Sequence, residues 1–264
     1  IVKKLPSDFD IFSPFTVRKP LCTQYAASGA PSCAQRLCAI SFSFTGLAQP
    51  IQTAHIKYEM SLNADGQEEM KQMAALMGNS IMDVYFTEWK QRVDMSMMGG
   101  MVVTKMFYDK QMNKSIMLQE MMGQKFKIKL DDQKIQDSKR KDSDSPKLSP
   151  KVTLDKKDRK KIQGYDCYKA TAAIENNGQK VLITCYITDQ INSPHSIIKE
   201  ADEISFGGFP LEYTLDMATM KILVTAKEID KNVNSSIFEV PTSGYKEMTL
   251  EEFTHKMGGA GLGF

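Results

Sequence analysis

Residues 80–130 read SIMDVYFTEWKQRVDMSMMGGMVVTKMFYDKQMNKSIMLQEMMGQKFKIKL, and they carry the strongest indication of the fold. Short runs such as Ile81–Thr87 and Gln91–Met97 alternate apolar with polar residues, and turn residues such as Gly99-Gly100 separate them. Alternation of this kind is typical of strands with one buried face. The stretch therefore predicts a meander of antiparallel hairpins, which continues through Met101–Tyr108, Ser115–Met121 and Lys125–Leu130.

Similar runs lie on both sides of this meander. They are His55–Leu62, Tyr165–Ile174, Lys180–Thr188, Phe209–Leu215 and Lys221–Ile229. No strand-helix-strand rhythm joins them, so a single antiparallel sheet is favoured. A sheet this long must curl, because flat open sheets are unusual. We therefore predict a mainly β protein with one strongly curved, unclosed sheet, a half barrel, in residues 49–264.

Two or three short helices are expected beside the sheet. Met70, Met73 and Met77 recur at helical spacing after Glu68-Glu69, which predicts an amphipathic helix with a methionine face. A last helix is predicted over Thr249–Met257, because Thr249-Leu250-Glu251-Glu252 has the pattern of a capping box.

Residues 131–161 are strongly polar and contain runs such as Asp155-Lys156-Lys157-Asp158-Arg159-Lys160-Lys161. Such a composition buries too little apolar surface to offset the ordering of the chain. We expect an exposed polar connection here, between two halves of the sheet.

The first 48 residues are interpreted as a leader. The apolar run Leu37–Ala48 follows Arg36 and ends in Gly46-Leu47-Ala48, as the end of a signal peptide would, so we place the cleavage after Ala48. Residues 1–35 show no periodicity, and two interpretations stay open for them: an unusually long leader, or sequence outside the native protein. The rest of the chain has no run of about 20 apolar residues that could span a bilayer.

Charge and motifs exclude several classes of function. Lys+Arg number 34 and Asp+Glu 32, so the net charge of +2 gives no field that would recruit nucleic acid. His55, His195 and His255 lie far apart, and the sequence has no HExxH, CxxC or GxSxG motif. We predict no catalytic residues, no enzymatic activity and no cofactor.

Methionine is the unusual residue, with 18 copies, most of them between Met60 and Met122. Flexible, polarisable methionines can line an adaptable apolar cavity. The predicted cavity residues are Met70, Met73, Met77, Met95, Met97, Met101, Phe107, Met117 and Met121. Because thioethers also bind Cu(I), a periplasmic copper site at Met95, Met97, Met98 and Met101 is the alternative.

Cys167 and Cys185 are the two cysteines after the leader, and they lie on consecutive strands of a hairpin predicted around Glu175-Asn176-Asn177-Gly178. A loop centred on Asn176 would place them opposite each other, and a loop centred on Asn177 would make them diagonal neighbours. Either register leaves two outcomes open, a disulfide or two buried free thiols.

Three segments carry a resemblance to a known family. They are Met95–Met101 through Met121–Lys125, Ile162–Ala170 leading to Tyr186-Ile187-Thr188, and Phe206–Tyr213 followed by Lys221–Ile229. Over about residues 55–255 the chain resembles an exported Gram-negative family of unknown function with a LolA-like fold, akin to outer-membrane lipoprotein carriers and to the GLPGLI secreted family.

The resemblance implies an unclosed barrel around short helices that handles lipid or lipoprotein. Together with the methionines, it predicts a non-catalytic protein of the periplasm or outer-membrane periphery that binds an acyl chain, a lipid or a lipoprotein in the concave face of its sheet. A copper-binding protein and an envelope interaction or structural protein without a ligand are the alternatives.

Overall fold

The computed structural model describes residues 49–64, 68, 71, 72, 75, 80–130, 151–176, 179–198, 204–217 and 220–256. The chain divides into two compact units, Ile1–Gly46 and Leu47–Phe264, and every described residue lies in the second. The leader and signal peptide predicted over residues 1–48 lie outside the described residues.

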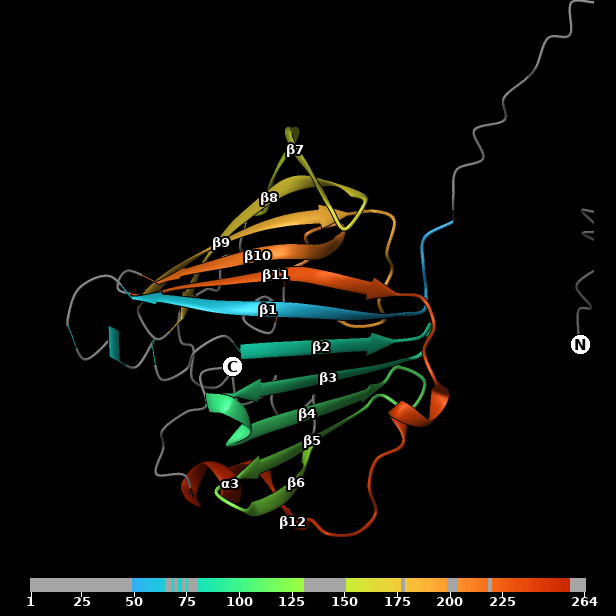
Figure 1. The fold of residues 1–264 in the computed structure, drawn as a ribbon, viewed down its shortest axis with the longest axis vertical. Helices are drawn as coiled ribbons and strands as arrows, with labels where there is room; N and C mark the ends of the chain where they lie inside the picture. The colour runs from blue at the N-terminus through green and yellow to red at the C-terminus, as the bar shows by residue number, and fades with distance from the viewer. Residues whose placement is uncertain are drawn as a thin grey trace, which may run out of the picture. The chain divides into compact units, whose positions relative to one another are not determined.

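Within the described part of the second unit, the strands form one sheet in the order β12-β6-β5-β4-β3-β2-β1-β11-β10-β9-β8-β7 (Figure 1). The strands are β1 (Ala54–Ala64), β2 (Ser80–Phe86), β3 (Lys90–Met97), β4 (Val102–Asp109), β5 (Lys114–Met121), β6 (Gln124–Leu130), β7 (Thr153–Ile162), β8 (Tyr165–Asn176), β9 (Gln179–Thr188), β10 (Phe209–Met217), β11 (Met220–Asp230) and β12 (Lys246–Met248). The prediction of one curved, unclosed and mainly antiparallel sheet is confirmed.

The sheet consists of two meanders, β2–β6 and β7–β11, and β1 pairs with β2 on one side and with β11 on the other. Short connections produce most of this order, because neighbouring strands joined by two to five residues pair as hairpins. Strands β9 and β10 are the exception within the meanders, because residues 189–208 link them. Strand β12 pairs in parallel with β6 at an end of the sheet, and an isolated parallel bridge joins Ile51 to Ile191.

Alternation of side chains gives the sheet two different faces. On one face Ile56 pairs with Val84 and Tyr58 pairs with Met82, and these four side chains are at most 2% exposed. We call this the inner face. The other, outer face carries polar residues such as His55, which pairs with Tyr85.

The prediction of an exposed connection over residues 131–161 is wrong in its last part. β7 occupies Thr153–Ile162 and pairs with β8, although nearly all of its side chains are exposed or half-buried. As the last strand of the sheet, β7 needs no continuous apolar face, and lysines on such edges oppose aggregation. Lys160 also pairs with Glu212, and Lys169 pairs with Asp158 at 3.1 Å. Residues 131–150 lie outside the described residues.

The C-terminal segment follows the sheet from its middle to one end. It continues from β11 through the short helix η3 (Ser235–Phe238) to β12 and then to α3 (Leu250–Lys256). The predicted capping box is confirmed: Glu252 N donates to Thr249 Oγ1 at 3.1 Å, and Thr249 N donates to Glu252 Oε2 at 2.8 Å. Phe253 packs edge-on against Phe126 of β6, with ring centroids 5.8 Å apart.

The predicted methionine helix is described only in part. Glu68, Lys71, Gln72 and Ala75 are helical and exposed. Met70, Met73 and Met77, which we expected to face the cavity, lie outside the described residues. A further short helix, η1 (Met98–Gly100), connects β3 to β4.

Candidate functional site: an apolar cavity on the inner face

A cavity of about 130 Å³ lies against the inner face of the sheet. Its walls come from β1–β5, from β10 and β11, and from the link between β9 and β10. The lining residues are Met60, Met82, Gln91, Val93, Met95, Met97, Met106, Phe107, Tyr108, Ser115, His195, Ser196, Ile197, Tyr213, Leu215, Ile222 and Val224. Most of the wall is apolar, and five of these residues are methionines.

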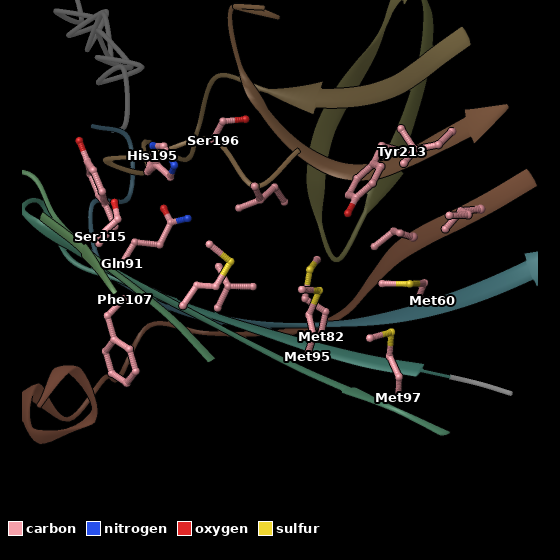
Figure 2. Close-up of a pocket in the computed structure, with 17 residues that line it drawn as sticks. Met60, Met82, Gln91, Met95, Met97, Phe107, Ser115, His195, Ser196 and Tyr213 are labelled. Carbon is pink, nitrogen blue, oxygen red and sulfur yellow. The ribbon is translucent and has the colours of Figure 1, made fainter. Parts of the chain in front are cut away.

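The two ends of the cavity differ in chemistry (Figure 2). Met60, Met82, Met95 and Met97 gather at one end, and Gln91, Ser115, His195 and Ser196 gather at the other. The register explains this separation, because Gln91 and Ser115 stand at the starts of β3 and β5, whereas Met97 ends β3. The cavity therefore offers apolar surface along its length and gathers most of its polar groups at one end, with the hydroxyl of Tyr213 on the methionine side as the exception.

Hydrogen bonds and ring contacts hold the polar end in place. Gln91 is 2% exposed, and its Oε1 accepts a hydrogen bond from Ser193 Oγ at 2.5 Å. The ring of His195 stacks on Tyr108, with centroids 4.4 Å apart. Both contacts join the link to the meander.

The link between β9 and β10 supplies the wall opposite the sheet. Its side chains at Ile191, Ile197, Ile198, Ile204 and Phe206 are buried in the main hydrophobic core. Burying such side chains contributes roughly 1.5–3 kcal/mol each, so the segment is drawn onto the inner face. The sequence predicted only a loose connection here.

Only some of the residues predicted to line the cavity do so. Met95 and Met97 line the cavity. Phe107 borders it, but its ring points away in Figure 2, and its register partner is Arg92 on the outer face. Met101 and Met121 do not line the cavity, and Met101 is 61% exposed.

Met117 also lies outside the cavity wall, for a different reason. It is 5% exposed and packs with Phe126, Ile128 and Phe253 in a second core cluster. α3 covers this part of the inner face, so a side chain that alternation directs inward is packed rather than available to a ligand.

Sequence reasoning missed several lining residues. Met60, Met82 and Met106 could have been found, because each alternates onto the apolar side of its strand. His195 and Ser196 carried no such signal, since only the path of the link brings them to the cavity.

Cys167 and Cys185 are both buried free thiols, so the disulfide considered from the sequence is not formed. Strands β8 and β9 pair in a register that sets Asn176 opposite Gln179 and Cys185 opposite Ala170. Cys167 is three residues from that partner, which is neither the opposite nor the diagonal position. Burial raises the pKa of Cys167 to about 11 and that of Cys185 to about 12, so both stay protonated at neutral pH.

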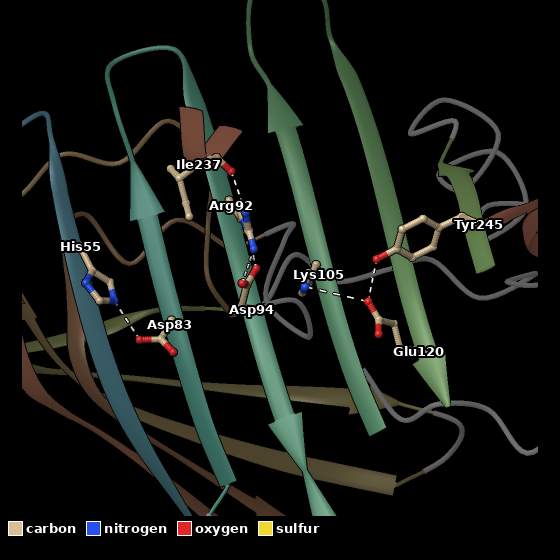
Figure 3. Close-up of polar contacts among 8 residues, drawn as sticks. All are labelled: His55, Asp83, Arg92, Asp94, Lys105, Glu120, Ile237 and Tyr245. Atoms are coloured by element: carbon tan, nitrogen blue, oxygen red, sulfur yellow. Dashed lines mark hydrogen bonds and ion pairs between the residues drawn. The ribbon is translucent and has the colours of Figure 1, made fainter. Parts of the chain in front are cut away.

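The outer face carries polar pairs instead of a cavity (Figure 3). His55 Nε2 lies 2.8 Å from Asp83 Oδ1, and Arg92 bonds both Asp94 and the carbonyl oxygen of Ile237, the latter at 2.7 Å. Tyr245 donates to Glu120 at 2.6 Å, and this bond, with Lys125, holds the pKa of the Glu120 carboxyl below its usual value. The bonds to Ile237 and from Tyr245 fasten the segment after β11 to the sheet.

Among the described residues, no three His, Cys, Asp or Glu side chains come close enough together to hold a metal ion. Of the four methionines considered for Cu(I), Met95 and Met97 lie on the cavity wall, whereas Met98 and Met101 belong to the turn after β3. The described helices include none with the length and apolar character needed to cross a bilayer.

Comparison with known proteins gives one family match. Residues 65–245 match the family model described as "Domain of unknown function (DUF4412)". No curated protein matches the chain.

Two solved structures are similar in part. The lipoprotein LppX of Mycobacterium tuberculosis is 11% identical with a TM-score of 0.34, and the match covers 68% of this chain and 88% of LppX. LprF from Mycobacterium bovis is 13% identical with a TM-score of 0.33, and the match covers 69% of this chain and 88% of LprF. Identities this low carry no information about ligand or activity.

Proposed function

The chain belongs to the DUF4412 family, and from this premise and the geometry of its cavity we propose that it is a non-catalytic binding protein for a hydrophobic ligand. The ligand is an acyl chain, or the apolar part of a lipid or lipoprotein, held against the inner face of the sheet. The methionine-lined cavity of about 130 Å³ is the observation that carries this proposal.

The driving force is the removal of apolar surface from water, worth roughly 25 cal/mol per Å². The two ends of the cavity give the ligand a direction. An apolar tail lies among Met60, Met82, Met95 and Met97, and a polar group lies beside Gln91 and His195, where it can form hydrogen bonds. The proposed ligand is therefore an amphiphile.

The volume limits how much of the ligand fits without rearrangement. A cavity of about 150 Å³ accommodates a molecule the size of benzene. A longer chain requires the methionines to move, and their three rotatable side-chain bonds permit this with little strain.

We place the protein in the cell envelope, in the periplasm or at the outer-membrane periphery of a Gram-negative bacterium, with lipoproteins or outer-membrane components as partners.

Displacement of an environment-sensitive fluorophore tests the proposal. Delipidated protein is expected to enhance the emission of anilinonaphthalene sulfonate, and decanoic acid is expected to reverse the enhancement at micromolar concentration. Met95→Trp fills the cavity and should abolish displaceable binding. Ile81→Trp adds the same side chain on the outer face of β2, where Ile81 is 39% exposed, and should leave binding unchanged.

The contradicting results are distinct from these. Wild-type protein that binds no displaceable fluorophore would overturn the proposal, as would equal binding by Met95→Trp and Ile81→Trp. Thermal unfolding of both variants verifies that the comparison is made between folded proteins.

A copper-binding function is the second candidate, because the thioethers of Met60, Met82, Met95 and Met97 gather at one end of the cavity. Thioether groups are soft ligands for Cu(I). Titration with Cu(I) under reducing conditions separates the two functions. Binding tighter than micromolar that Met95→Leu weakens would favour the metal, because leucine preserves the apolar volume and removes the sulfur.

A further inference from the structure

Two turns at one end of the meander expose methionine side chains. The turn between β3 and β4 contains Met101, which is 61% exposed, and the turn between β5 and β6 contains Met122, which is 88% exposed. Val102 pairs with Met121, so the two turns are neighbours. We call residues 98–101 and 121–124 the methionine turns.

The backbone of the second turn does not explain its methionine. Met122 and Gly123 form a two-residue turn between the paired residues Met121 and Gln124, with φ values of 51° and 74°. Such turns favour Asn-Gly, because a left-handed residue with a side chain is strained and asparagine tolerates this conformation best. A methionine in this position is strained and also exposes its apolar side chain to water.

The same turn geometry elsewhere in the chain uses a polar residue. Gln163 and Gly164 join β7 to β8 with φ values of 49° and 84°. The fold therefore accepts a polar side chain at this position, and the methionine requires a different explanation.

The first methionine turn, residues 98–101, borders the apolar end of the cavity. Met97, the last residue of β3, lines the cavity and directly precedes the turn at residues 98–101. Met60 lies at the same end, whereas Gln91 and His195 lie at the other (Figure 2). Apolar side chains thus continue from the cavity wall to the exposed turn.

The size and charge of this surface indicate the kind of partner. A standard protein interface buries about 20–30 residues on each side, far more than two turns provide. Apolar side chains on loop tips beside cations are suited to the boundary between headgroups and acyl chains. Lys125 follows the second turn and is half exposed, and Lys256 Nζ lies 3.1 Å from Gln124 Oε1. Glu120 is the acidic neighbour and bridges both Lys125 and Lys105.

We propose that the methionine turns insert into an anionic lipid surface, so that the apolar end of the cavity faces the source of its ligand. Docking itself requires only the turns, and its purpose, ligand exchange with the bilayer, rests on the proposed function. Insertion of both side chains accounts for methionine at a position where the backbone favours asparagine.

Co-sedimentation with vesicles of equal parts phosphatidylglycerol and phosphatidylcholine tests the proposal. The double variant Met101→Gln/Met122→Asn is expected to bind at least about tenfold more weakly than wild type, because two apolar side chains no longer leave water. The matched control is Met112→Gln. Met112 is 58% exposed in the turn at the other end of the β4–β5 hairpin, and the control should bind like wild type.

A second measurement separates docking from folding and from ligand binding. Met122→Asn should not lower the midpoint of thermal unfolding, because asparagine tolerates the left-handed backbone. The double variant should still bind decanoic acid as wild type does. If wild type also fails to bind decanoic acid, the proposed function fails while docking can stand.

Three outcomes overturn the docking proposal. They are absence of wild-type binding to the vesicles, equal losses in the double variant and in Met112→Gln, and unchanged binding by the double variant. A lower molecular mass of the double variant in sedimentation equilibrium, with vesicle binding unchanged, would assign the methionine turns to a second copy of the chain.

Discussion

The β8–β9 hairpin and the β3–β4 hairpin have the same alternating pattern but fill their inner faces differently. In β8–β9 the inward residues Ala170, Ala172, Ile183, Cys185 and Ile187 are at most 2% exposed. In β3–β4 the inward residues Val93, Met95, Met97 and Met106 all line the cavity. The inner face of β8–β9 is filled by close packing, whereas the inner face of β3–β4 borders the cavity.

The type of side chain, and not the strand pattern, therefore determines where the cavity lies. Branched and small residues have few rotamers and pack closely against their neighbours. Unbranched thioethers adapt to several shapes, so a surface composed of them can open and close around a guest. If this explanation is right, substitutions in the two hairpins should have unequal effects.

The largest effect is expected in the packed hairpin. Ile183→Ala removes three carbon atoms from a side chain that is fully buried, and we expect the free energy of unfolding to fall by about 4 kcal/mol. Urea unfolding followed by circular dichroism measures it. Ligand binding should change little in protein that remains folded, because Ile183 does not line the cavity. A loss of unfolding free energy smaller than that of Met95→Ala, the matching truncation in the β3–β4 hairpin, would contradict the comparison.

A smaller loss of stability is expected for Met95→Ala in the open hairpin. Met95 already borders empty space, so fewer packing contacts disappear, and we expect a loss of about 2 kcal/mol, at the low end for such truncations. The enlarged cavity should bind decanoic acid more tightly than wild type does. Fluorophore displacement measures this gain. Weaker binding would show that the Met95 side chain contacts the ligand and does not merely occupy its space.

The bond between β1 and β10 gives the third effect. Tyr58 is fully buried and its Oη donates to the carbonyl oxygen of Pro210 at 2.9 Å. Tyr58→Phe leaves that carbonyl without its donor, and we expect a loss of about 1.5 kcal/mol. Urea unfolding again provides the measurement. A neutral substitution would mean that water replaces the hydroxyl, and hence that this part of the inner face is wet.

The smallest effect concerns pH and the buried thiol of Cys185. Burial raises its pKa from 9.0 to about 12. The unfolded thiol therefore loses its proton first, and stability falls as the pH rises from about 9 to about 12. Comparing wild type with Cys185→Ala isolates a contribution of roughly 0.4 kcal/mol at pH 9. Parallel curves of unfolding free energy against pH for the two proteins would contradict the burial of this thiol.

Sequence patterns predicted most strands because each hairpin is a local structure. The alternation of apolar and polar residues located the ends of β1–β6 and β8–β11 to within about two residues. The pair Thr249 and Glu252 located the start of α3. β7 was missed because its strand is held by main-chain bonds to β8 and by ion pairs, neither of which leaves an apolar pattern.

The site was less predictable than the fold. Met95 and Met97 were anticipated on the cavity wall, but Met117 was not distinguished from them, since only the packing of α3 against β6 separates a covered inward residue from an open one. The register that pairs Asn176 with Gln179 places Cys167 and Cys185 out of reach of each other. A change of one residue in a loop decides this, and the sequence permitted several loops.

Strand alternation and turn residues act over a few neighbouring positions, so the amino-acid sequence was enough to predict an antiparallel sheet with a methionine-rich side. Which inward side chains border the cavity and which are covered by other side chains depends on tertiary contacts. These contacts depend on the path of the link that carries His195, on α3, and on the joining of the two meanders through β1, where residues that are distant in the chain meet.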